Sequence, residues 1–185
     1  MGIVASATYA INPASGAFSD LLALYAKAYT PGFARHNSLT LAVAYQNTIG
    51  GFESDDALSA LSFKSTRLLP RGFYSTQITN NNYLAGSVNY QLPIWYPDGG
   101  VRAIVYFKRV RLNAGFDYAQ FERQHFTADG TLQKEWHRIN SWGGDVILDV
   151  NLFSQPAAAT TAVKLSLYKP SEGSLFFSAG MELPF

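Results

Sequence analysis

Hydrophobic and polar residues alternate along most of this chain with a period of two, the spacing of side chains on the two faces of a β-strand. Residues 174–185 show this alternation most clearly. One face of this segment is entirely apolar: Leu175, Phe177, Ala179, Met181, Leu183 and Phe185. The other face is mostly small or polar. An apolar strand face that continues to a terminal aromatic residue is unusual in a soluble domain and is typical of the last strand of a transmembrane β-barrel.

The same alternation predicts further strands, so that about eight are expected in all. The others cover residues 3–12, 21–29, 39–46, 82–94, 101–121, 140–152 and 161–168. A helix over residues 19–28 is the competing prediction for the second of these segments, because Ala and Leu favour helices. The strand patterns on both sides favour a strand there.

The strand predicted over residues 101–121 has the most informative pair of faces. Its apolar face comprises Val110, Leu112, Ala114, Phe116 and Tyr118. Its polar face comprises Arg109, Arg111, Asn113, Gly115 and Asp117. The polar face needs water or charged partners, whereas the apolar face needs lipid or a protein core. We expect the basic residues here, Lys108 included, to meet carboxylates rather than to form an anion site. Those carboxylates are Asp117, Asp145 and Asp149.

The predicted connections differ in length. Residues 47–81 form a long loop and residues 122–138 a polar loop, whereas residues 31–38, 95–100 and 153–160 form turns. With antiparallel pairing of successive strands, both longer loops leave from the same end of the sheet. A loop as long as 47–81 is uncommon in a compact domain, but a barrel can take such a loop into its lumen.

Composition narrows the class of protein. The 185 residues suffice for one domain, spanning residues 1–185. Only 15% of the residues are charged, against the usual quarter, and 15% are aromatic. This balance favours a membrane barrel, and a net charge of +1 predicts no nucleic-acid partner. The first residues lack the basic and apolar regions of a signal peptide. An outer-membrane protein must carry such a signal, so we expect this chain to be the C-terminal part of a longer protein.

Candidate catalytic chemistry is sparse. The histidines, His36, His125 and His137, are expected in turns or loops, and their spacing matches no metal-binding motif. The sequence contains no Gly-x-Ser-x-Gly nucleophile motif. We therefore expect no cofactor, no metal and no enzymatic activity.

Two short motifs, in order, resemble a known family. The first is Leu69-Pro-Arg71-Gly72-Phe73 in the long loop, and the second is Gly115-Phe116-Asp117-Tyr118-Ala119, on the second strand after the loop. They resemble the bacterial surface-antigen superfamily of outer-membrane assembly and translocation barrels, which includes Bam-type assembly factors and two-partner secretion transporters. In that family the Arg-Gly-Phe loop is tucked into the barrel and its Arg meets the acidic residue. The resemblance therefore implies a latch between loop and lumen, made by Arg71, Gly72, Phe73 and Asp117. A guanidinium in a confined lumen needs such a carboxylate.

The end of the chain resembles the C-terminal β-signal of bacterial outer-membrane proteins. The matching residues are Ser178, Gly180, Leu183 and Phe185. This resemblance implies the outer-membrane insertion machinery as a partner. The run 92–111 is similar to surface-antigen barrels linked to periplasmic β-propeller domains in Bacteroidetes-like bacteria.

Taken together, the pattern and the resemblance predict an all-β fold, the C-terminal half of an antiparallel transmembrane barrel of about sixteen strands. The implied location is the bacterial outer membrane. The implied role is assembly of outer-membrane proteins or translocation of polypeptides, without enzymatic activity. The implied partners are outer-membrane lipids, the N-terminal half of the same barrel, and unfolded outer-membrane or secreted polypeptides.

Two alternatives remain open at this point. One is a self-contained barrel of about eight strands that acts as an adhesin or a lipid-active enzyme. The other is a soluble β-sandwich binding module.

Overall fold

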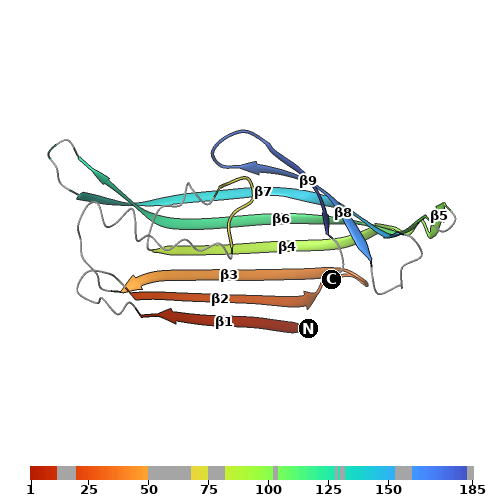
Figure 1. Ribbon diagram of the computed structural model, residues 1–185, viewed down its shortest axis with the longest axis horizontal. Coiled ribbons are helices and arrows are strands. Elements are labelled where there is room, and N and C mark those ends of the chain that lie inside the picture. The colour runs from red at the N-terminus through yellow and green to blue at the C-terminus, as the bar shows by residue number, and fades with distance from the viewer. Residues whose placement is uncertain are drawn as a thin grey trace.

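The computed structural model describes residues 1–11, 20–49, 68–74, 82–101, 104–127, 129, 132–152 and 160–182. These residues form a single antiparallel sheet of nine strands, which confirms the all-β prediction (Figure 1). The strands are β1 (Gly2–Ala10), β2 (Asp20–Pro31), β3 (Ser38–Ile49), β4 (Tyr83–Trp95), β5 (Gly99–Val101), β6 (Val105–Phe126), β7 (Leu132–Leu152), β8 (Thr161–Pro170) and β9 (Phe176–Glu182). The strand prediction for the second segment was therefore correct.

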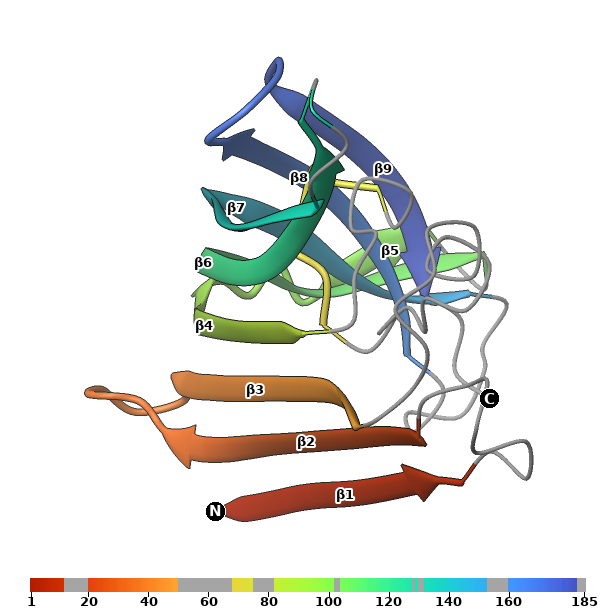
Figure 2. The ribbon, with the colours of Figure 1, turned by 90° about the vertical axis from the view of Figure 1, so that its left-hand side faces the viewer.

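The order of strands in the sheet is β1-β2-β3-β4-β6-β7-β8-β9, and β5 pairs only with β6. Figure 2 shows the sheet curving from β1 round to β9. Within the described residues β1 and β9 do not pair with each other, so the sheet is open. The described strands also form one sheet rather than the two packed layers of a β-sandwich.

Strand register confirms the predicted alternation of faces. One row of cross-strand partners is Leu41, Val88, Phe116 and Trp142, and all four side chains are exposed. We call this side of the sheet the outer face. The neighbouring row includes Ser87, Asp117 and Ser141, which are buried. We call this side the inner face.

The prediction for residues 122–138 was wrong. These residues are not a loop for most of their length, because β6 continues to Phe126 and β7 begins at Leu132. His125 and His137 therefore lie in strands. The sequence hid this extension because residues 122–138 lack a regular alternation of apolar and polar residues.

The prediction for residues 95–104 was also incomplete. The turn at 95–100 contains the start of β5, and the long strand begins at Val105 instead of residue 101. The chain folds back so closely that a Cβ on Gly100 would lie 2.2 Å from the carbonyl oxygen of Val105. Only glycine permits that approach.

Of the long loop predicted at residues 47–81, residues 47–49 belong to β3 and residues 68–74 are described as a separate segment. As predicted, the β3–β4 and β6–β7 connections leave from the same end of the sheet (Figure 1). Segment 68–74 lies on the inner face and completes the apolar core. The buried core residues are Phe73, Tyr83, Ala85, Ala119, Phe121 and Ile139, and Leu68 and Leu69 pack against them.

The described residues include no helix with the length and apolar character needed to cross a membrane.

Candidate functional site

The site is built on a tight turn at residues 70–73. The backbone N–H of Phe73 donates to the carbonyl oxygen of Pro70 at 3.2 Å. Gly72, at the third position, has φ +89°, the conformation that a type II turn requires there and that glycine adopts without strain. A Cβ on Gly72 would also lie 3.1 Å from Cβ of Phe176. The turn places Arg71 against the inner face.

Arg71 forms a bidentate ion pair with Asp117 on β6. Its Nε donates to Oδ2 at 2.7 Å, and its Nη2 donates to Oδ1 at 2.8 Å. The backbone N–H of Arg71 donates to the same Oδ2 at 3.1 Å. Side chain and backbone therefore both bind one carboxylate, a geometry with high strength and directional specificity.

Three further strands contribute partners to Arg71. Nη2 donates to Oδ1 of Asn89 on β4 at 2.7 Å. Nη1 donates to the hydroxyl of Tyr168 on β8, and the guanidinium carbon lies 4.1 Å from the centre of that ring. Nη1 is also 3.6 Å from Oδ2 of Asp145 on β7. We call these five residues, Arg71, Asn89, Asp117, Asp145 and Tyr168, the Arg71 cluster.

Other side chains fix the two carboxylates of the cluster. Ser87 and Ser141 donate to Asp117 at 2.7 and 3.2 Å. Asn113 donates to Asp145 at 2.7 Å. Burial by itself lowers the pKa of the Arg71 guanidinium. The hydrogen bond and negative charge of Asp117, together with Tyr168 and Asp145, outweigh burial and raise that pKa above its ordinary value. Arg71 is therefore permanently charged, and the carboxylate of Asp117 balances its charge.

Two glycines make room for the cluster. Asn89, Gly115, Gly143 and Tyr168 are successive cross-strand partners. A Cβ on Gly143 would lie 2.9 Å from Cδ1 of Tyr168, and a Cβ on Gly115 would lie 2.4 Å from Nη2 of Arg71. The Tyr168 ring thus lies across Gly143, with its hydroxyl over Gly115, where the guanidinium is also seated.

A second set of charges, the Asp149 cluster, lies on the inner face of β6 and β7. Arg109 and Arg111 both bind Asp149, through Oδ2 and Oδ1, the latter at 2.5 Å. Asp149 is buried, whereas Arg109 is partly exposed. The expected pairing of basic residues with carboxylates is found here for both arginines.

The structure brings all four residues of the expected latch together. Arg71 and Asp117 are in contact, Gly72 forms the turn, and Phe73 packs in the core. Of the expected β-signal, Ser178 and Gly180 pair with Ser166 and Lys164 of β8. Leu183 and Phe185 lie outside the described residues.

Sequence reasoning missed Asn89, Tyr168 and the roles of Gly115 and Gly143. The alternation places all four on the inner face, but periodicity cannot indicate which inner residues meet a segment from a distant loop. A usable signal was the pair of glycines inside strands, since glycine in a strand interior often marks a close approach.

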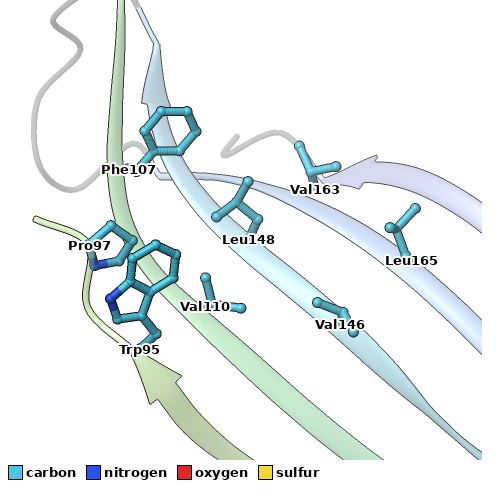
Figure 3. Close-up of a pocket in the computed structure, with 8 residues that line it drawn as sticks. All are labelled: Trp95, Pro97, Phe107, Val110, Val146, Leu148, Val163 and Leu165. Atoms are coloured by element: carbon cyan, nitrogen blue, oxygen red, sulfur yellow. The ribbon is translucent and has the colours of Figure 1, made fainter. Parts of the chain in front are cut away.

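The outer face carries a wholly apolar groove of about 460 Å³ at the end of the sheet near Trp95. Figure 3 shows Trp95 and Pro97 on one side of this groove and Val163 and Leu165 on the other. Val110 and Leu148 lie between them.

No cluster of three or more potential metal ligands occurs among the described residues. Comparisons with family models, curated proteins and solved structures found no match to this chain.

Proposed function

We propose that this chain is part of an outer-membrane β-barrel of the surface-antigen superfamily, which acts in outer-membrane protein assembly or polypeptide translocation without enzymatic activity. One observation carries the proposal. The segment with Arg71 is docked by an ion pair onto the polar part of the inner face, while the opposite face of the same strands is apolar and exposed.

The outer face supports a location in lipid. Exposed apolar side chains continue across the sheet from Leu41 on β3 through Phe116 on β6 to Phe177 on β9. An apolar surface of this extent would promote association in water. A hydrocarbon environment removes that cost, and the polar inner face then requires water in the barrel interior.

The open edges support additional strands. Among the described residues, β1 and β9 each pair with one neighbouring strand. Backbone groups on their other edges need partners in lipid, where each unpaired group costs several kcal/mol. Along the path from β1 to β9 the eight successive strands alternate in direction, so β1 and β9 run antiparallel to each other. An even number of further strands, such as the N-terminal half of the same barrel, would therefore close it with antiparallel pairing throughout.

The docked segment supports a role in assembly or translocation. A segment held inside a barrel by Arg71 controls how much of the interior is open, and a bidentate pair holds it in one orientation. This arrangement agrees with the resemblance of both motifs to the surface-antigen superfamily.

The location is tested by fractionation. Membranes from cells that express the protein are washed with alkaline carbonate and then extracted with detergent. We expect the protein to stay in the washed membranes and to appear only in the detergent extract. Release by carbonate would contradict the membrane location.

The role is tested with Arg71→Ala. We expect this variant to lower the steady-state amounts of other outer-membrane proteins or of secreted polypeptides. The control is Arg35→Ala, which removes the same charge from the exposed β2–β3 turn and should leave these amounts unchanged. If the Arg71 variant is stably inserted and the amounts of other outer-membrane proteins and of secreted polypeptides are all normal, the assembly or translocation role is excluded.

A further inference from the structure

A second apolar groove lies on the outer face, between β6, β7 and β8. It holds about 490 Å³, and the small residues Ala114 and Gly144 line it between larger apolar neighbours, including Leu112 and Leu167. Val146 lines both this groove and the one near Trp95. The two depressions are therefore neighbours on the outer face.

The character of the outer face changes at one end of this groove. Trp142 lines that end and is 62% exposed. Beyond it, the outer positions of β7 are Asn140 and Arg138, and their partners on β6 are Tyr118 and Gln120. A Trp at a transition from apolar to polar surface is typical of the level where hydrocarbon meets headgroups.

Two cations lie at this transition. Lys169 is the cross-strand partner of Trp142 and lines the groove. Its ammonium donates to the carbonyl oxygen of Gly173 at 3.1 Å, a neutral acceptor. Arg138 is exposed. In the described part of the chain neither cation forms an ion pair, and the carboxylate of Glu172 in the β8–β9 turn lies 2.9 Å from His137 instead.

We propose that this region binds an anionic phospholipid, one whose headgroup phosphate is not neutralised by a cationic group of the same lipid. The acyl chain lies in the groove over Ala114 and Gly144, and Lys169 with Arg138 binds the phosphate. The lipid is favoured over a free anion because Lys169 lines the apolar groove and Arg138 lies beyond Trp142 at the same end, and neither forms an ion pair among the described residues. This inference rests on the proposed membrane location and is independent of the role in transport.

The experiment uses fluorescence from Trp142 alone. Trp95→Phe and Trp136→Phe remove the other two of the three tryptophans. The full chain is reconstituted in phosphatidylcholine vesicles that contain a small fraction of lipid with brominated acyl chains, which quench tryptophan on contact. The brominated lipid is either phosphatidylglycerol or phosphatidylcholine with identical chains.

We expect brominated phosphatidylglycerol to quench Trp142 at a mole fraction at least fivefold lower than brominated phosphatidylcholine, since each cation near the surface contributes about a fivefold preference. Lys169→Ala with Arg138→Ala should abolish the preference, whereas Arg35→Ala should preserve it. Ala114→Phe, which fills the groove and keeps both cations, should weaken quenching by phosphatidylglycerol. Added inorganic phosphate should not compete.

The outcomes separate the two proposals. Equal quenching by both lipids, or a preference that survives loss of both cations, would overturn the lipid site and leave the membrane location intact. Competition by inorganic phosphate would overturn the requirement for an acyl chain. Absence of quenching by either lipid would overturn the membrane location and the lipid site together.

Discussion

The inner face carries two arginine–aspartate clusters that use the same chemistry for different purposes. In the Asp149 cluster, Arg109 and Asp149 are register partners on two strands that already form a hairpin. In the Arg71 cluster, the arginine comes from the β3–β4 connection and meets residues of β4, β6, β7 and β8. The first cluster adds to a pairing that backbone hydrogen bonds already make, whereas the second attaches a separate segment to the sheet.

Exposure separates Arg109 from the other two arginines. The Arg109 side chain is 40% exposed, the Arg71 side chain 23% and the Arg111 side chain 17%. Charges near water gain little from pairing, because solvent screens them. Charges withdrawn from water lose much when one partner is removed, because the other remains uncompensated. The comparison therefore predicts a ranking of substitutions.

Asp117→Ala should have the largest effect. It leaves Arg71 against the sheet without its bidentate partner, and the free energy of unfolding should fall by about 3 kcal/mol. Denaturant unfolding in lipid vesicles, followed by tryptophan fluorescence, measures this change. An Arg71→Asp, Asp117→Arg exchange should recover part of the loss; no recovery would contradict a specific pair.

Asp149→Ala should rank second, with a loss of about 1.5–3 kcal/mol in the same assay. Two arginines lose their acceptor, but Arg109 can turn toward water. In addition, we expect segment 68–74 to resist added protease in the unaltered protein and in Asp149→Ala, whereas Asp117→Ala should make it susceptible. Equal susceptibility in both variants would show that the two clusters are not functionally distinct.

Gly115→Ala should cost about 1–3 kcal/mol by overpacking, since the new Cβ would lie 2.4 Å from Nη2 of Arg71. Gly180→Ala is the matched control, because a Cβ there meets nothing within 4 Å. It should change the unfolding free energy by less than about 0.5 kcal/mol. Similar losses for both glycines would show that strand propensity, rather than the guanidinium, sets the cost.

Arg109→Ala should have the smallest effect, within about 1 kcal/mol. Asp149 keeps its ion pair with Arg111, in which Nη2 lies 2.5 Å from Oδ1. The Arg109 side chain that is removed is partly exposed to water. A loss as large as that of Asp117→Ala would remove the distinction between the two clusters.

Much of the fold followed from the sequence because strand faces have an intrinsic period of two. The alternation from Val110 to Tyr118 correctly assigned both faces of β6, and the aspartates expected to balance the basic residues include Asp149, which does so. The β6–β7 extension was missed because residues 122–138 lack the alternation of apolar and polar residues that indicates a strand. The contact of Arg71 with Asp117 was expected only through the family resemblance, since spacing alone does not join a loop to a strand.

The sequence by itself determined which side chains face each side of the sheet, since that assignment depends on local backbone geometry. Only the tertiary structure decided that Asn89, Asp145 and Tyr168 complete the site of Arg71 and that Gly115 and Gly143 leave space for it. Those contacts depend on register across four strands and on where segment 68–74 docks. Both arise from packing and burial over the whole sheet, which no local pattern encodes.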